Sequence, residues 1–311
     1  MDTDRGEPPA AASTDLITAG ALTLLVTFGY AAYRDWRTRE VHESVWLAGG
    51  AVGAVLGAVA LAPDGPLALA LWALVALFVL QHLLPWDEWV ERFSEDLPGY
   101  LEIAMYVAVG VVLVVAGLRY GVGDAGLPDA VIAAYVTTLA GRALFETRLL
   151  YGGADAKAVI VAGLILPLDA SPVVHLPAAA TGILAFYPFS LTLLIDGALF
   201  GLAVPIALAA RNLAQGSFEF PRGFVGYLLP VDELPDRFVW LRDPTFSGEE
   251  EDVDSTEEDV ALRRRQAQEL RAKGVHEVWV TPQVPYVVLL AAGALAGVLF
   301  GNLLFDLLAW V

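Results

Sequence analysis

Long apolar stretches separated by short polar segments dominate this chain. Apolar runs occur at about residues 16–33, 44–62, 66–84, 100–118, 128–148, 156–168, 173–211 and 284–310. Several approach or exceed the roughly 20 residues that a helix needs to cross a bilayer. Pro188 and Pro205 interrupt the run 173–211. We expect its part 188–211 to cross the membrane and 173–187 to form a re-entrant or outer-surface segment. The pattern predicts an all-α, polytopic transmembrane helical bundle with about eight crossings and a small cytoplasmic insert.

Arginine residues orient these predicted crossings. Arg34, Arg37 and Arg39 follow the first apolar run, and basic residues are enriched in cytoplasmic segments. We therefore expect that end of the first helix in the cytoplasm and the N-terminus outside. Alternation of the crossings then leaves only Arg5 and Arg119, of the 18 basic residues, on the outer side. The distribution predicts a multi-pass protein of the cell membrane.

Polar segments divide the chain into four predicted parts. They are an extracytoplasmic N-terminal tail at 1–15, a transmembrane core at 16–211, an acidic cytoplasmic insert at 212–283 and a C-terminal transmembrane helix at 284–311. The tail lacks the basic start of a cleavable signal peptide, so we expect the first apolar run to remain as a helix. The loop at 85–99 spaces its aromatic residues as an amphipathic helix on the inner membrane surface does.

Two short elements are predicted within the insert. Ser255 and Glu258 fit a capping box, which begins a helix that runs to about Lys273 and ends at Gly274. Residues 276–281 alternate between apolar and polar side chains, as in a short strand. The insert carries no motif that is specific for one chemistry, although it could contact a substrate or a partner.

Composition excludes several classes of chemistry. The chain has no cysteine, which rules out disulfides, thiolate metal sites and a cysteine nucleophile. It contains no zinc-protease helix motif with paired histidines, no Gly-x-Ser-x-Gly and no phosphate-binding P-loop. We therefore predict neither a metal nor a cofactor. The formal charge of −18, from 36 acidic and 18 basic residues, is typical of a salt-adapted proteome.

The segment Tyr151–Lys157 carries the strongest candidate chemistry. It reads Tyr-Gly-Gly-Ala-Asp-Ala-Lys between two apolar runs, which places Asp155 and Lys157 at or just inside the membrane. A charge costs on the order of 2.5–3.5 kcal/mol at mid-helix and less near the interface, so an ionisable group there is a functional-site candidate. Gly152 and Gly153 permit positive φ and close backbone approach. Asp155 could also merely cap the helix that follows.

Asp35, at the cytoplasmic end of the first predicted helix, provides a second carboxylate. The predicted topology places Asp35 and Asp155 on the same membrane face at similar depth. Two close carboxylates share a proton, so one can activate a water as a base while the other protonates or polarises a scissile carbonyl. The pair therefore indicates aspartyl-protease chemistry. Taken alone, Asp35 fits better as a helix-end residue in a basic, solvated turn.

The two aspartate segments together resemble those of one known family. Gly-Gly-Ala-Asp-Ala-Lys before an apolar helix resembles the GxGD-type motif of type IV prepilin peptidases, including archaeal preflagellin peptidases. Asp35 with the following Arg39 and Val41 resembles the other catalytic segment of that family. The resemblance covers about residues 16–211 and implies that Asp35 and Asp155 are the catalytic pair on the cytoplasmic side. It also implies that the substrates are prepilin or archaellin precursors, which lose a short, positively charged leader peptide. Membrane lipid is the other expected partner, and no nucleic acid is expected.

One position departs from the family pattern. Ala154 stands where the family has a glycine directly before the aspartate. A literal match, Gly121-Val122-Gly123-Asp124, occurs earlier in the chain. The predicted topology puts that aspartate outside, opposite Asp35, and no lysine follows it as Lys157 follows Asp155. The earlier match is more simply interpreted as an outer turn.

Several alternatives stay open. Lys157 could hold one aspartate ionised or merely snorkel to the interface. Asp196, within an apolar run, fits helix packing better than the site. Membrane carboxylates also serve proton- or ion-coupled transporters, which prefer them near the midplane, although the chain shows no convincing internal repeat. A non-catalytic assembly scaffold would tolerate the loss of either aspartate. Small residues at regular spacing predict a helix-contact surface at Gly49, Gly50, Gly53 and Gly57.

Overall fold

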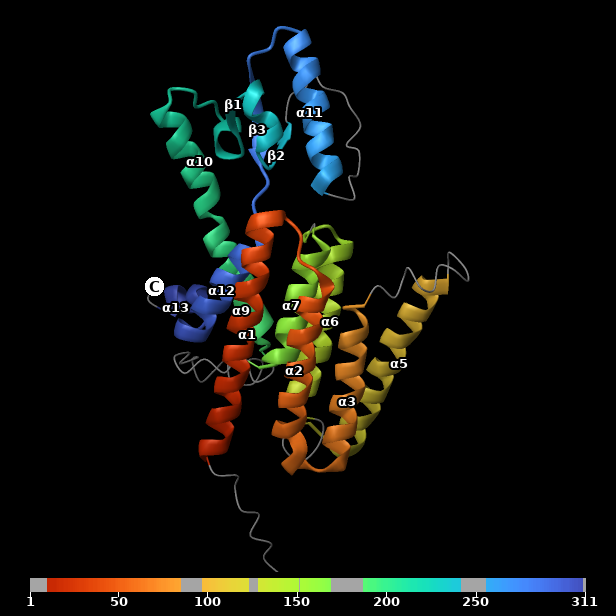
Figure 1. The fold of residues 1–311 in the computed structure, drawn as a ribbon. Coiled ribbons are helices and arrows are strands. Elements are labelled where there is room, and N and C mark those ends of the chain that lie inside the picture. Colours follow the sequence, from red (N-terminus) through yellow and green to blue (C-terminus); the bar gives the residue numbers. More distant parts are fainter. Residues whose placement is uncertain are drawn as a thin grey trace, which may run out of the picture. The chain divides into compact units, whose positions relative to one another are not determined.

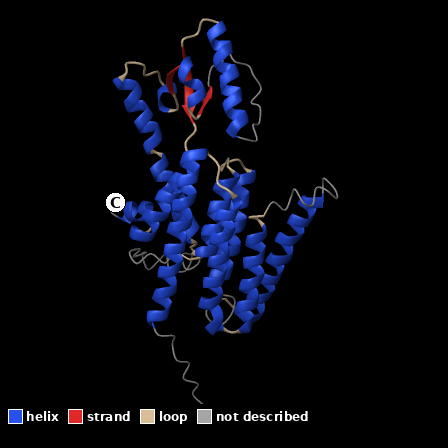
Figure 2. Ribbon diagram, in the orientation of Figure 1, coloured by secondary structure: helices blue, strands red, loops and turns tan. Residues whose placement is uncertain are grey.

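The computed structural model of the chain describes residues 10–84, 97–122, 128–150, 152–168, 187–241 and 256–309. This part of the chain is mostly helical, at 77%, with eleven α-helices and three strands (Figure 1). Residues 1–33, 41–198 and 287–311 form one compact unit, here called the helical unit. Residues 34–40 and 199–286 form the second, here called the mixed unit because it holds the strands (Figure 2).

Helices build almost all of the described part of the helical unit. They are α1 (Ala10–Thr38, whose last turn belongs to the mixed unit), α2 (Glu43–Leu61), η1 (Ala62–Asp64), α3 (Pro66–Gln81), α5 (Leu97–Tyr120), α6 (Asp129–Glu146), α7 (Gly153–Ile165), α9 (Phe189–Gly201, up to residue 198), α12 (Tyr286–Phe300, from residue 287) and α13 (Leu303–Ala309). Only α1, α2, α5 and the run through α9 into α10 (Ala203–Ala214) are both long and apolar enough, among the described residues, to cross a membrane.

Those four candidate spans correspond to four of the predicted apolar runs. They cover Thr14–Thr38, Glu43–Asp64, Tyr100–Tyr120 and Phe189–Ala214. The helices in two other runs are shorter, because α3 has 16 residues and α7 has 13. The helical class is therefore confirmed, and four of the apolar runs form helices that could cross a membrane, while the total of eight crossings and the cytoplasmic insert stay predictions.

The last apolar run forms two helices where the sequence predicted one. Gly301 takes a φ of 87° after α12, a left-handed conformation that glycine adopts without strain. The side-chain oxygen of Asn302 then accepts a hydrogen bond from the backbone N–H of Phe305, at 3.1 Å, and so caps the start of α13. A glycine at positive φ followed by a capping asparagine breaks the helix even within an apolar sequence.

Helix α7 is the most deeply buried helix of the unit. Every residue from Ala158 to Ile165 is buried, which is expected of a helix that is apolar on all sides. It packs against α2 and α6 (Figure 1). Glycines allow these helices to approach α7 closely. A Cβ at Gly53 would lie 2.7 Å from Cα of Ile165, and one at Gly141 would lie 2.7 Å from Cγ1 of Ile160.

The predicted glycine surface of α2 is confirmed. A Cβ at Gly49 would meet Thr27 of α1, one at Gly50 would meet Leu80 of α3, and one at Gly57 would meet Trp72. The Trp72 indole N–H also donates to the carbonyl of Ala54, at 2.8 Å. Small residues let helix backbones approach closely in a membrane, where van der Waals packing drives helix association.

The mixed unit is organised around a three-stranded antiparallel sheet in the order β1-β3-β2. Its elements are α10, η3 (Arg222–Phe224), β1 (Tyr227–Pro230), η4 (Val231–Asp236), β2 (Val239–Leu241), α11 (Thr256–Ala272) and β3 (Glu277–Pro282). Its core contains Leu229, Val231, Leu234, Val239, Ala267, Leu270, Val278 and Val280. The predicted helix up to Lys273 and the predicted strand after it are confirmed as α11 and β3, and Gly274 between them has a φ of 74°.

Several predictions lie wholly or partly outside the described residues. They are most of the tail at 1–15, the surface helix across 85–99 apart from its last residues in α5, the outer turn after Gly121, the re-entrant or surface segment at 173–187 apart from Tyr187, and the capping residue Ser255.

We expect that Gly53→Ala will destabilise the helical unit. The added methyl group meets backbone atoms of α7, which cannot rotate away, and overpacking of this kind costs about 1–3 kcal/mol. Thermal unfolding of the purified protein in detergent measures the effect. Gly29→Ala is the matched control, because a Cβ there meets nothing within 4 Å and alanine favours a helix. Equal melting temperatures for the two variants would contradict this packing.

Candidate functional site: two aspartates and the turns that hold them

Asp155 lies in the first turn of α7. Gly152 is the N-cap residue, with φ −89° and ψ 130°, and the backbone N–H of Asp155 donates to the carbonyl of Gly152 at 3.0 Å. The side chain of Asp155 is partly exposed, whereas the next residue, Ala156, is buried. The first turn of a helix carries unpaired backbone N–H groups and the positive end of the helix dipole, both of which favour a carboxylate there. Asp155 is thus a partly exposed acid at the N-terminal end of a buried helix.

The sequence predicted that Gly152 and Gly153 would allow a positive φ, and the structure gives them another role. Neither has a positive φ, since Gly152 is extended and Gly153 already belongs to α7. A Cβ at Gly152 would instead lie 2.7 Å from Oδ2 of Asp155, so Gly152 leaves space for the carboxylate. A Cβ at Gly153 meets nothing within 4 Å. The requirement for glycine is therefore steric, and it is confined to position 152.

Lys157 forms an ion pair with Glu43, the first residue of α2. The sequence left two roles for this lysine, an aspartate partner or an interfacial anchor, and the pair with Glu43 was not among them. Both side chains are partly buried, at 24% and 34% exposed. The side chain of His42 accepts from the backbone N–H of Ser44 and caps the same end of α2. The pair fastens the beginning of α7 to the beginning of α2.

Asp35 lies near the end of α1, in the mixed unit, and is 8% exposed. Its backbone carbonyl accepts two hydrogen bonds from Arg39: one from the backbone N–H at 3.0 Å and one from Nη1 at 3.2 Å. Burial lowers the pKa of Arg39, and the negative charge of Asp35 opposes that shift. The alternative of a solvated helix-end residue does not fit this burial. The residue is an enclosed carboxylate beside a guanidinium group.

Asp35 and Asp155 fall in different units, and each unit is described by itself. Their pairing as a dyad therefore stays a prediction. Within the described residues, no three side chains of the metal-binding types His, Asp and Glu gather as a metal site would require.

A second group of charges lies within the helical unit. Glu102 of α5 pairs with Arg142 of α6 at 3.1 Å, and Arg142 also pairs with Glu146 at 2.7 Å. The Nε2 atom of His82 lies 3.8 Å from Glu102, and its Nδ1 atom lies 2.7 Å from the carbonyl of Phe78. Pairing of this kind offsets the cost of charge near the membrane. The group ties α3, α5 and α6 together.

Asp196 is fully buried and has a structural partner. Its Oδ1 atom accepts from the backbone N–H of Leu303 at 2.9 Å, which caps the start of α13. Asn302 donates from Nδ2 to the hydroxyl of Tyr187 at 2.9 Å. These bonds agree with the packing role that the sequence favoured for Asp196.

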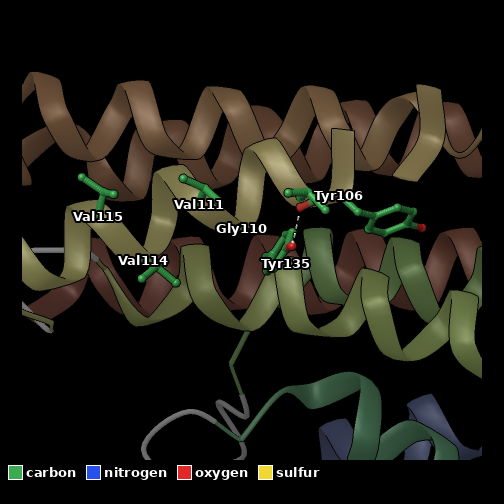
Figure 3. A pocket seen from close by; sticks show the side chains of 7 residues that line it. Tyr106, Gly110, Val111, Val114, Val115 and Tyr135 are labelled. Carbon is green, nitrogen blue, oxygen red and sulfur yellow. Dashed lines mark hydrogen bonds between the residues drawn. The ribbon is translucent and has the colours of Figure 1, made fainter. Parts of the chain in front are cut away.

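Each unit has a cavity among its described residues. An apolar cavity of about 360 Å³ lies between α5 and α6, and the Tyr135 hydroxyl donates across it to the carbonyl of Tyr106 at 2.8 Å (Figure 3). Its lining contains no carboxylate. A polar cavity of about 530 Å³ lies beside β1 in the mixed unit, where Arg211 and Glu277 contribute to its wall. Neither cavity contains Asp35 or Asp155.

A search with protein-family models found no match to this chain, and a search of curated proteins found no significant match.

We expect that reversing one charge of the Glu43–Lys157 pair will destabilise the helical unit. Lys157→Glu places two carboxylates together, while the double exchange Glu43→Lys with Lys157→Glu restores the attraction. Partly exposed pairs contribute about 0.2–1 kcal/mol, so we expect a coupling energy in this range. A double-mutant cycle on thermal stability in detergent measures it. A coupling energy of zero would show that the pair does not join α2 and α7.

Proposed function

We propose that this protein is a membrane aspartic endopeptidase of the prepilin peptidase type. It cleaves the short, basic leader peptide from prepilin or archaellin precursors at the cytoplasmic face of the membrane. Asp35 and Asp155 form its catalytic dyad. The proposal rests on the paired motifs in the sequence, and the local structure around each aspartate supports it.

The ion pair between Lys157 and Glu43 carries most of this support. It joins the start of α7, which bears Asp155, to the start of α2. Only residues 39–42 separate the end of α1, which bears Asp35, from α2. Such a short link favours the same membrane face for both ends. Chain connectivity therefore favours a common face for the two aspartates, as a dyad requires.

The chemistry follows from two carboxyl groups that share one proton. The ionised carboxylate takes a proton from a water molecule, whose oxygen attacks the scissile carbonyl carbon. The protonated carboxyl group gives its proton to the carbonyl oxygen, which produces a neutral tetrahedral intermediate. Collapse of that intermediate breaks the C–N bond as the leaving nitrogen receives a proton from one carboxyl group, while the other carboxylate takes a proton from a hydroxyl of the intermediate, which restores the shared proton. The dipole of α7 favours negative charge in its first turn, which suits Asp155 to the role of base.

The charge of the chain suits a basic substrate segment. Its formal charge is −18, and an acidic surface attracts a positively charged leader over distances of about a Debye length, near 8 Å at physiological ionic strength. The attraction weakens as salt concentration rises.

A specific observation favours proton- or ion-coupled transport as a second candidate function. Transporters place buried carboxylates at interrupted helices, and Asp196 meets the break between α12 and α13. The capping bond to Leu303 explains Asp196 without a transported ion, so we rank this function second. Proton flux into vesicles that contain the purified protein, abolished by Asp196→Asn, would favour transport.

We expect that Asp35→Asn and Asp155→Asn each abolish leader removal while the protein remains in the membrane. Asparagine keeps the side-chain size but cannot carry the proton, and loss of acid–base catalysis lowers rates by about 10²–10⁴-fold or more. Co-expression with a tagged precursor reports cleavage as a shift in size on a gel. Asp196→Asn is the matched control and should retain processing. Trimming by the Asp35→Asn protein would exclude the dyad, and it would favour a non-catalytic scaffold if the Asp155→Asn protein also retained function.

We expect that Gly152→Ala lowers processing more than Gly153→Ala does. The methyl group at position 152 takes the space of the Asp155 carboxylate and turns it away, whereas the same group at position 153 meets open space. Displacement of a catalytic group by about 1 Å can cost about 10²-fold in rate. Initial rates with purified precursor, beside melting temperatures for both variants, measure the difference. Equal rates would show that the position of the carboxylate near Gly152 is not the reactive one.

A further inference from the structure

The end of α1 that carries Asp35 packs with a segment about 200 residues further along the chain. Residues 34–40 and 199–286 belong to the same compact unit. The sequence had assigned no chemistry to the insert at 212–283, and its motifs supplied no reason to connect it with Asp35. The shared unit makes the insert part of the surroundings of this aspartate.

Phe238 is the point of contact. The guanidinium carbon of Arg39 lies 4.9 Å from the centre of the Phe238 ring, and that of Arg263, from α11, lies 5.6 Å from it. A guanidinium group within about 6 Å of an aromatic centre gains about 0.5–1 kcal/mol at exposed sites and more when desolvated. Arg263 is 3% exposed, so its contact is desolvated. One ring therefore binds two cations that come from distant parts of the sequence.

The ring itself is held by the sheet. Phe238 immediately precedes β2, and its carbonyl accepts from the backbone N–H of Gln283 at 2.9 Å. Val239 beside it belongs to the buried core of the mixed unit. Pairing of β2 with β3 thus fixes the place of Phe238, and with it the ring that Arg39 contacts.

Arg39 links Phe238 to the end of α1. Its φ of 59° is left-handed, a conformation that non-glycine residues seldom adopt and that ends the helix. In that conformation its backbone N–H and Nη1 both donate to the carbonyl of Asp35. The Thr38 hydroxyl completes the turn by donating to the carbonyl of Arg34 at 2.9 Å. Arg39 therefore contacts both the backbone carbonyl of Asp35 and the ring of Phe238.

We propose that Phe238 is a positioning residue, which orders the turn that carries Asp35 through its cation–π contact with Arg39. The catalytic part of this proposal rests on the proposed function. Phe238 does not touch the reacting atoms; it orders the turn that carries one of them. The insert is then a required component of the site, and removal of its aromatic contact lowers turnover without preventing the leader from binding.

The test compares Phe238→Leu with Phe238→Tyr and Phe238→Trp in the purified protein. Leucine keeps an apolar side chain but removes the ring, whereas tyrosine and tryptophan keep the cation–π contact. We expect Phe238→Leu to lower kcat about 10- to 100-fold with little change in KM, and the two aromatic variants to remain near wild type. Trp240→Leu is the matched control, because Trp240 lies on β2 in the same unit and is 56% exposed.

Two variants of Arg39 separate its charge from its backbone. Arg39→Lys keeps the positive charge but loses the planar guanidinium group that lies near the ring. Arg39→Gly accepts a positive φ without strain but has no side chain to stack. We expect both to lower kcat, as Phe238→Leu does. A rate near wild type for Arg39→Gly would show that the backbone turn alone positions Asp35, which overturns the role of Phe238.

Hydrogen–deuterium exchange gives a readout that does not depend on activity. The peptide that covers residues 34–41 should exchange at least several-fold faster in Phe238→Leu, while peptides from β1 and β3 stay protected as in the wild type. Unchanged exchange in residues 34–41 together with unchanged kcat would overturn the proposal. If Asp35→Asn still processes precursor, the proposed function fails, and the exchange result alone decides whether Phe238 holds the end of α1.

Discussion

The close packing of α7 within the helical unit is the constraint on which the remaining local structure depends. Association of helices in a membrane gains little from the hydrophobic effect, because lipid tails are as apolar as the side chains they would replace. The gain comes from contact, and contact is closest where Gly53 and Gly141 remove side chains between α7 and its neighbours. An apolar helix enclosed in this way can hold polar groups only at its ends. The first turn of α7 is therefore where Asp155 and Lys157 occur.

Helix ends and charges are matched throughout the described part of the helical unit. The Lys157–Glu43 pair joins two helix starts, and Asp196 caps the start of α13. Each arrangement supplies a partner to a group whose desolvation would otherwise be costly. Asp155, in the same first turn as Lys157, is partly exposed and has room beside Gly152.

The mixed unit places Asp35 in a different physical setting. Here the carboxylate is nearly buried beside Arg39, whose guanidinium group contacts the ring of Phe238.

The sequence by itself determined the helical class, the apolar spans and the two aspartates worth attention, since length, apolar composition and the rarity of charge in apolar runs are properties of the chain. It also predicted α11 and β3, because Gly274 ends the helix before the strand begins. Only the tertiary structure decided that Gly152 is needed for space, that Lys157 pairs with Glu43, and that the final apolar run breaks at Gly301. It alone brought Arg39, in the turn after Asp35, to the ring of Phe238. These contacts connect residues up to about 200 positions apart, and local patterns carry no information about which distant side chains meet when the chain packs.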